Sequence, residues 1–144
     1  MSIDTNKALL RRVTEEFYNQ GNLAVADELF AADYVHHDRA APDVRDRDGL
    51  KHSHAATRAA FPDFHVVVEH LIAEGDLVMT HWTLQGTHLG DWQGLAPTGK
   101  RVTASGLVLN RIREGRVHET WWGYDLMGVL QQLGAIPTPP APTP

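Results

Sequence analysis

The chain has 144 residues, of which 42% are hydrophobic and 22% charged, and its formal net charge is −5. This composition is typical of one soluble globular domain, and the lack of a basic run argues against a nucleic-acid partner. No segment has the apolar length of a signal peptide or a membrane span, so we expect a cytoplasmic protein with no membrane partner. The sequence contains no cysteine, which excludes disulfides and thiolate metal sites.

Two helices are predicted at the start of the chain, where apolar residues recur three and four positions apart. The first helix is capped by Asp4 or Thr5 and ends near Gly21. The second begins after Asn22, which is a favourable capping residue, and ends before Tyr34.

A third helix follows after a polar interval. Residues 34–38 form a short extended piece that carries two histidines, and residues 40–47 read as a loop. The third helix covers residues 48–60, and Pro62 ends it.

From residue 64 the chain becomes rich in β-branched and aromatic residues, which favour strands. The predicted strands are His65–Ile72, Leu77–His88, Lys100–Arg113 and Arg116–Tyr124. Short hairpin signals at residues 75–76 and 114–115 and a longer loop at residues 90–99 connect them. Helices followed by a run of antiparallel strands predict an α+β fold.

The last strand leads directly into a final short helix. Asp125 lies at its N-cap position, and the apolar residues from Leu126 to Leu133 have helical spacing. This helix is expected to end at Gly134. The proline-rich residues 137–144 form a tail that we expect to be disordered. Residues 1–136 are therefore expected to form a single domain.

Both faces of the middle strands carry apolar residues, which an open sheet with one solvated face does not tolerate. We therefore expect a curved sheet whose concave side is closed by the helices over a cavity. The other side of the sheet is expected to be partly covered by a second subunit, as in a homodimer. Such a cavity suits a hydrophobic small molecule as substrate or ligand.

Three segments carry a resemblance to a known family: GTHLG at residues 86–90, PTGK at residues 97–100, and the ending at residues 128–134. With them, nearly the whole chain up to Gly134 resembles the SnoaL-like polyketide cyclases of the nuclear transport factor two-like superfamily. The resemblance implies a cone-shaped α+β barrel with three N-terminal helices packed on a curved antiparallel sheet. It also implies chemistry without a cofactor and frequent dimerisation through the sheet.

The resemblance also implies where the chemistry takes place. The cyclases close a ring by an aldol step whose base is an aspartate on the last strand, and that position holds Trp122 in this chain, three residues before Asp125. An asparagine of their first short strand corresponds to His36. In the related limonene epoxide hydrolases, an arginine and the first aspartate of an Asp-Arg-Asp set correspond to His81 and Thr83. With this alignment to the family, the residues expected on the cavity face are His36, His81, Thr83, Val108, Asn110, His118, Thr120 and Trp122.

The candidate catalytic residues are His36 and His81, together with Asp125, which is either a helix cap or a relocated base. Histidine exchanges a proton near neutral pH, which suits enolisation of a carbon next to a carbonyl. Each histidine has a structural alternative as a hydrogen-bonded core or surface residue, and His88 in the turn motif is expected to be structural. The candidate substrate-binding residues are Tyr18, Thr83, Trp92, Asn110, His118, Thr120 and Trp122.

No HxH or HExxH spacing supports a metal site, so no metal and no cofactor is predicted. The leading hypothesis is a cofactor-independent enzyme that closes a ring on a polyketide-like or ketone substrate. A cofactor-free hydroxylase or isomerase of the same family is one alternative. A binding protein that kept the cavity without the base is another, because fold and function are loosely linked in this superfamily.

Overall fold

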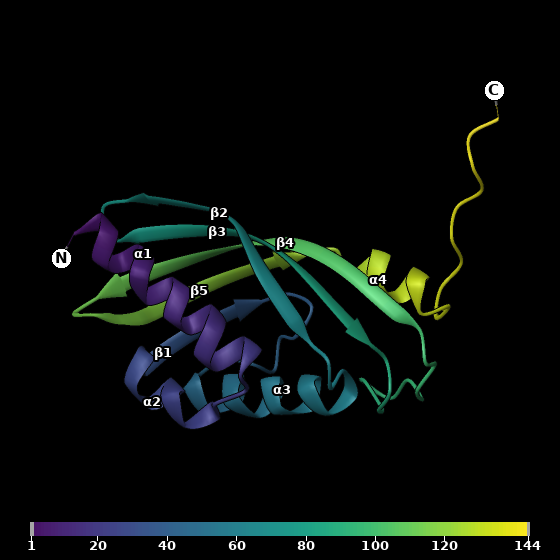
Figure 1. The fold of residues 1–144 in the computed structure, drawn as a ribbon, viewed down its shortest axis with the longest axis horizontal. Coiled ribbons are helices and arrows are strands. Elements are labelled where there is room, and N and C mark those ends of the chain that lie inside the picture. Colours follow the sequence, from purple (N-terminus) through teal and green to yellow (C-terminus); the bar gives the residue numbers. More distant parts are fainter. Residues whose placement is uncertain (1, 144) are drawn as a thin grey trace.

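Five strands form one curved sheet in the order β1-β5-β4-β3-β2, in a computed structural model that describes residues 2–143 (Figure 1). The strands are β1 (Phe30–Asp38), β2 (His65–Glu74), β3 (Leu77–Thr87), β4 (Arg101–Arg113) and β5 (Arg116–Tyr124). From β2 to β5 each strand is antiparallel to its neighbours, whereas β1 lies parallel to β5 at one edge.

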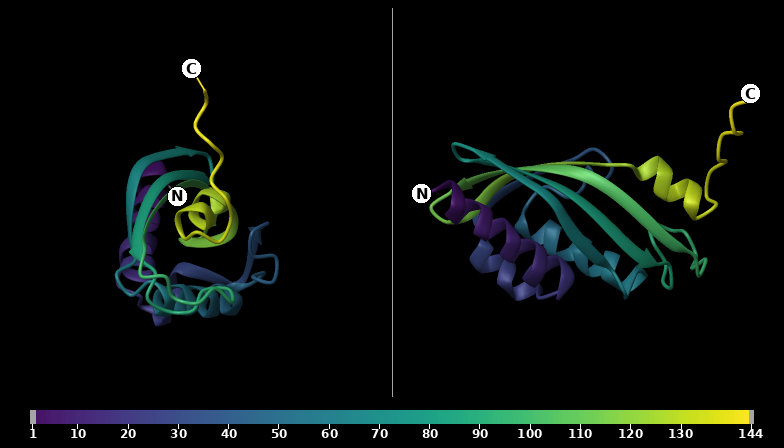
Figure 2. Two further views of the ribbon diagram at one scale, coloured as in Figure 1. Left: turned by 90° about the vertical axis from the view of Figure 1, so that its right-hand side faces the viewer. Right: turned by 45° about the horizontal axis from the view of Figure 1, so that its top comes forward.

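The helices that precede β2 form a layer on the concave side of the sheet, and the sheet curls over them (Figure 2). They are α1 (Ile3–Arg12), which continues as the π-helix η1 (Val13–Asn19), then η2 (Leu23–Val25), α2 (Ala26–Leu29) and α3 (Arg47–Ala60). The short helix α4 (Leu126–Gln132) follows β5. Within residues 2–143, no helix has both the length and the apolar composition needed to cross a membrane.

The predicted α+β fold with a curved sheet is confirmed, and two local predictions are corrected. The second helix ends at Leu29, and residues 30–33 belong to β1. Phe30 is the register partner of Val117 of β5, and the register then shifts before Val35. Pairing satisfies backbone groups that would otherwise be left without partners. The cap of the first helix is Ser2, whose hydroxyl accepts a hydrogen bond from the Thr5 backbone N–H at 3.1 Å, and not Asp4 or Thr5.

The largest cluster of buried hydrophobic side chains joins the helical layer to the end of the sheet where β3 and β5 begin. Phe17 of η1 packs edge-on against Phe30, with ring centroids 5.6 Å apart, and Phe30 packs in the same way against Tyr34. Val78 of β3 and Val117 of β5 are fully buried in the same cluster. This cluster holds the helices on the sheet at one end, while a cavity occupies the region beside it.

Candidate active site

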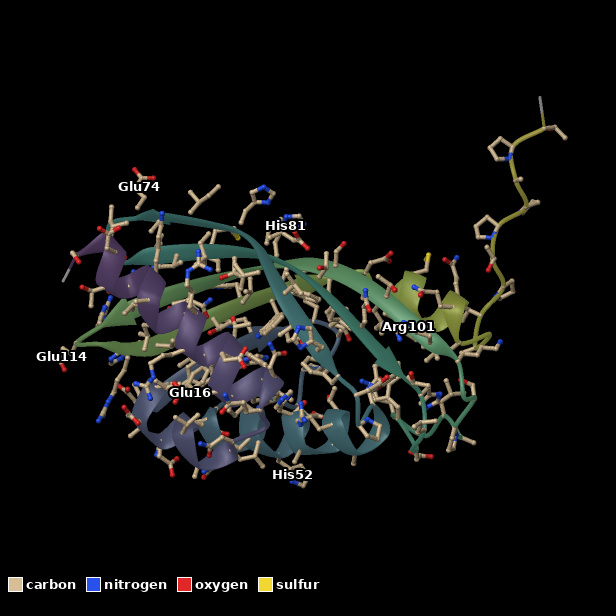
Figure 3. All side chains as sticks on the ribbon, in the orientation of Figure 1. Glu16, His52, Glu74, His81, Arg101 and Glu114 are labelled. Atoms are coloured by element: carbon tan, nitrogen blue, oxygen red, sulfur yellow. The ribbon has the colours of Figure 1, made fainter. Side chains whose placement is uncertain are left out.

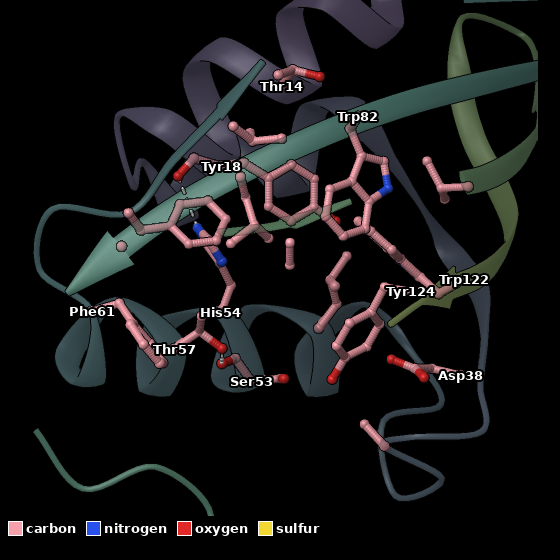
Figure 4. A pocket seen from close by; sticks show the side chains of 18 of the residues that line it. Thr14, Tyr18, Asp38, Ser53, His54, Thr57, Phe61, Trp82, Trp122 and Tyr124 are labelled. Carbon is pink, nitrogen blue, oxygen red and sulfur yellow. Dashed lines mark hydrogen bonds between the residues drawn. The ribbon is translucent and has the colours of Figure 1, made fainter. Parts of the chain in front are cut away.

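A cavity of about 200 Å³ lies between the concave face of the sheet and the helices α1, η1 and α3 (Figure 4). Its volume exceeds the roughly 150 Å³ that holds a benzene molecule in an engineered protein cavity. The apolar and aromatic part of the lining includes Leu10, Val13, Tyr18, Phe30, Phe61, Phe64, Val66, Trp82, Leu84, Trp92, Val108 and Trp122. A ligand with at least one ring and mostly apolar surface fits such a lining.

Four aromatic side chains form one wall of the cavity. The Trp122 ring meets Trp82 and Tyr18 edge-on, with centroids 5.5 Å and 5.8 Å apart, and Tyr124 lies beyond Trp82 at 6.3 Å. Gly106 of β4 is the register partner of both Trp82 and Tyr124. A Cβ atom at Gly106 would collide with both side chains, so this position needs glycine for the close approach of the two rings.

His54 is held by the end of the π-helix. A helix leaves its last carbonyl oxygens without intrahelical partners, and here the His54 Nε2–H donates to the Tyr18 carbonyl oxygen at 3.0 Å. Arg58, one turn further along α3, donates to the carbonyl oxygens of Tyr18 and Asn19, both at 3.0 Å. Because a carbonyl only accepts, His54 Nε2 carries the hydrogen, and Nδ1 is the nitrogen with a free lone pair.

His36 belongs to a second group of buried hydrogen-bonded side chains, which lie on β1, β4 and β5. Its Nδ1 lies 2.8 Å from the Tyr34 hydroxyl, so Nε2 is the nitrogen that remains for a ligand. The Thr120 hydroxyl donates to Asn110 Oδ1 at 2.7 Å, which orients the Asn110 amide. Asn110 also lines the cavity, and its amide nitrogen has no hydrogen-bond partner among residues 2–143.

Burial keeps both histidines neutral at neutral pH. Loss of solvation lowers the pKa of His36 to about 4, opposed by the negative charge of Asp38. It also lowers the pKa of His54 to about 4, opposed by the hydrogen bond to the Tyr18 carbonyl. The expectation that a cavity histidine titrates near neutral pH is therefore wrong, and both imidazoles are neutral donors or acceptors here.

Tyr18 supplies a hydroxyl to the cavity. Burial raises the pKa of Tyr18 well above its ordinary value, with smaller contributions from Tyr34 and from the charge of Asp38. The phenol therefore stays protonated, and within residues 2–143 it has no hydrogen-bond partner. It is a buried donor that a ligand oxygen can use.

The prediction that His81 and Thr83 face the cavity is wrong by one residue. Side chains alternate along a strand, and on β3 it is Thr80, Trp82 and Leu84 that line the cavity. His81 lies on the outer face of the sheet, where its ring stacks on that of His70 (Figure 3). The Thr83 hydroxyl, on the same outer face, donates to Glu69 at 2.7 Å.

His118 and Asp125 also lie outside the cavity lining. The pairing of β5 with β4 shifts between Arg111 and Ile112, and at this irregularity His118 turns toward Asp33, 3.5 Å away. Asp125 caps α4, since its Oδ1 accepts a hydrogen bond from the Gly128 backbone N–H at 2.9 Å. The geometry therefore supports the cap among the two interpretations of Asp125.

The remaining predicted site residues do converge. Tyr18, His36, Trp92, Asn110 and Trp122 line the cavity, and Thr120 lies directly behind Asn110. His88 is fully buried, and its Nδ1 accepts a hydrogen bond from the Thr98 backbone N–H across the loop that carries Trp92.

Sequence reasoning assigned no site role to several polar residues of the lining, among them His54 and Asp38. His54 follows Leu50 by four positions on the buried face of α3, a spacing that places both on one side of a helix. Asp38 follows His36 by two positions, which places both on one face of a strand. Both signals were present in the sequence, although neither specifies chemistry without the partners that the fold supplies.

Comparison with known proteins gives one consistent result. The sequence model of the SnoaL-like polyketide cyclases matches residues 8–133. AcmA, the aklanonic acid methyl ester cyclase of Streptomyces galilaeus, is 28% identical over 134 residues, which cover 88% of this chain and 89% of AcmA.

Solved structures show the same fold. IdmH, a proposed polyketide cyclase from Streptomyces antibioticus, is 34% identical, with a TM-score of 0.80 over 90% of this chain and 98% of IdmH. AclR, a proposed hydroxylase from Streptomyces galilaeus, is 28% identical, with a TM-score of 0.85 over 96% of this chain and 87% of AclR. With a family match over most of its length and the cone-like fold of these proteins, the chain belongs to the SnoaL-like polyketide cyclase family.

Proposed function

We propose that this protein is a cofactor-independent acid/base enzyme that closes a ring on a hydrophobic polyketide-like or ketone substrate by an intramolecular aldol step. The observation that carries the proposal is the pairing of an aromatic cavity with two neutral hydrogen-bond donors, the Tyr18 hydroxyl and the Asn110 amide. Donors fixed in place in a largely apolar cavity stabilise the negative charge that develops on a carbonyl oxygen during enolisation.

The two donors come from different elements and are fixed independently. Tyr18 belongs to η1, and its ring packs edge-on against both Trp122 and His54. Asn110 belongs to β4 and is oriented by Thr120 of β5. Because neither donor is on a mobile loop, both are positioned before the substrate arrives, which lowers the cost of reorganisation during reaction.

The charge of the lining favours a neutral substrate. Asp38 is the one carboxylate among the lining residues that the structure describes, and that lining contains no lysine or arginine. A carboxylate ligand would be buried against a like charge with no cation to compensate, which is unfavourable. Ketones and esters therefore suit the cavity better than free acids. AcmA is named for a methyl ester substrate, which is consistent with this preference.

The test is incubation of the purified protein with aklanonic acid methyl ester, followed by chromatography and mass spectrometry. Intramolecular aldol closure gives a product of unchanged mass and different retention. We expect Tyr18→Phe and Asn110→Leu each to lower kcat by about 100-fold, the usual effect of losing one such donor. His81→Ala tests which face of β3 lines the cavity. This variant should retain full activity, because His81 lies on the outer face.

Two results would contradict ring closure. A product heavier by one oxygen atom would indicate hydroxylation, the reaction class proposed for AclR. Saturable quenching of tryptophan fluorescence without any product would indicate a binding protein, with Trp82 and Trp122 as the reporters in the cavity wall.

A further inference from the structure

We propose that Asp38 is the general base of this cavity and removes the proton from the carbon next to the carbonyl of the bound substrate. This inference rests on the proposed function and adds the residue that carries out its first step. It follows from the position of Asp38 on β1, from its hydrogen bonding, and from the charges that surround it.

The fold turns Asp38 toward the cavity. In the pairing of β1 with β5, His36 is the partner of Thr120 and Asp38 is the partner of Trp122, so these side chains share the concave face. Asp38 belongs to the lining and is only half-buried. Figure 4 shows its carboxylate in the part of the cavity where Tyr124 and Ser53 of α3 also point.

One carboxylate oxygen is fixed and the other is free. Asp38 Oδ1 accepts a hydrogen bond from the Ala40 backbone N–H at 2.8 Å, in the turn that follows β1. Oδ2 has no hydrogen-bond partner among residues 2–143, and no lysine or arginine of this part of the chain forms an ion pair with Asp38. The backbone therefore orients the carboxylate, while Oδ2 keeps a free lone pair that can accept a proton.

The surrounding groups are neutral and respond to this charge. Burial, with the charge of Asp38 as a second cause, raises the pKa of Tyr124 to about 12. The same charge raises the pKa of Tyr18 and opposes the lowering of the pKa of His36. Asp38 is thus the charged centre of a site whose phenols stay protonated and whose imidazoles stay neutral.

The chemical step balances without any further reagent. Asp38 Oδ2 takes the proton from the α-carbon, the C–H bond breaks, and its electron pair becomes the enolate, whose oxygen accepts hydrogen bonds from Tyr18 and Asn110. The enolate carbon then attacks the second carbonyl of the same substrate and forms the C–C bond. The resulting alkoxide takes the proton back from the Asp38 carboxylic acid, which regenerates the carboxylate.

The experiment measures enolisation separately from ring closure. 2-Tetralone, a neutral bicyclic ketone, is incubated with the protein in D₂O, and the loss of its α-proton signals is followed by ¹H NMR. We expect Asp38→Asn to lower kcat for exchange by about 100-fold or more, with KM unchanged within about threefold, because a general base acts in the transition state. The matched control is Asp43→Asn, an exposed aspartate of the loop after β1, which should exchange at the wild-type rate.

A binding measurement shows whether the variant keeps an intact cavity. Wild-type protein and Asp38→Asn are titrated with methyl 2-naphthoate, which is neutral, and with 2-naphthoate, which carries a negative charge on a similar framework. Both proteins should bind the ester equally well within about threefold. The preference of the wild-type protein for the ester over the acid should fall at least tenfold in Asp38→Asn, because the like charge is gone.

The outcomes separate this proposal from the proposed function. Exchange that survives in Asp38→Asn would overturn the role of Asp38 while leaving the enzyme hypothesis intact. Lost exchange together with lost ester binding would show a structural role and would also overturn it. Absence of exchange in the wild-type protein would overturn both proposals for ketone substrates.

Discussion

At the scale of single residues, the burial of two imidazoles links the stability of this protein to pH. The pKa of His36 and of His54 is lowered from the ordinary value of 6.5 to about 4 by loss of solvation. The unfolded chain therefore binds more protons than the folded chain between these pH values, and acidification through this window favours unfolding. Above pH 6.5 both states are neutral at these positions, and the contribution to stability is complete.

We expect the free energy of unfolding to fall as the pH is lowered from about 6.5 to about 4, by roughly 2 to 3 kcal/mol for each histidine. In the variant His54→Gln, the decrease in unfolding free energy over this pH range should be about half as large as in the wild-type protein. His52→Gln is the control on the same helix, because His52 points to solvent (Figure 3). Urea denaturation at pH 7, 5.5 and 4 checks the prediction, and an equal decrease in all three proteins would contradict it.

At the scale of elements, α4 shows how a helix start is specified by one side chain and one glycine. The Asp125 carboxylate accepts the Gly128 backbone N–H in the first turn. A Cβ atom at Gly128 would collide with that carboxylate, so the cap and the glycine require each other. α4 in turn places Val129 and Leu133 in a core cluster with Phe61 and Val102.

Replacing Asp125 by alanine should therefore cost about 1 kcal/mol of unfolding free energy, the usual value of an N-cap. Gly128→Ala should also destabilise the wild-type protein, since the new methyl group displaces the cap. In the Asp125→Ala background, however, the same change should be neutral or stabilising, because alanine is the better helix former. A double-mutant cycle by chemical denaturation measures this reversal of sign, and simple additivity would show that the two residues do not interact.

At the scale of the whole molecule, the outer face of the sheet carries an apolar surface that the chain itself does not cover. Its exposed side chains include Ile72 at 67%, Leu107 at 51%, Val67 at 45% and Val35 at 43% of their full exposure. A hollow beside the stacked His70 and His81 lies on the same face and is lined in part by Ile72, Met79 and Leu107. Exposed apolar side chains gathered on one face are typical of interaction sites.

We expect this face to form a homodimer in solution. Leu107→Glu, which places a charge at the centre of the surface, should convert the dimer to a monomer at micromolar concentration. Met127→Glu is the matched control, because Met127 is 63% exposed but lies on α4. Sedimentation equilibrium measures both, and a wild-type monomer at micromolar concentration would contradict the prediction.

The C-terminal tail is a second feature at this scale. Residues 137–143 contain no helix or strand, and the chain extends away from the sheet after α4 (Figure 1). One long hydrogen bond, from Gln131 Nε2 to the Pro137 carbonyl oxygen at 3.4 Å, links the start of this segment to α4. Deleting residues 138–144 should therefore change the unfolding free energy by less than about 0.5 kcal/mol. Thermal and chemical denaturation check this, and a larger loss would show that the tail docks on the domain.

The sequence by itself determined the features that depend on near neighbours. The strand before Tyr124, the cap at Asp125 and the turns at residues 75–76 and 114–115 are local, because each involves residues within a few positions of one another. The sequence also placed Tyr18, His36, Asn110 and Trp122 in the cavity wall.

Only the tertiary structure decided which face of β3 is the inner one and what residues 30–33 become. Both faces of β3 carry apolar side chains, so the alternation of side chains along the strand does not show whether Trp82 or its neighbours His81 and Thr83 point inward. Packing of the sheet against η1 and α3 determines which face is the inner one. Residues 30–33 follow a helical pattern locally but belong to β1, in which Phe30 pairs with Val117 of β5, more than eighty positions away. The convergence of Asp38 and His54 on one cavity is non-local in the same way, since it depends on β1 and α3 being held against a sheet that forms later in the chain.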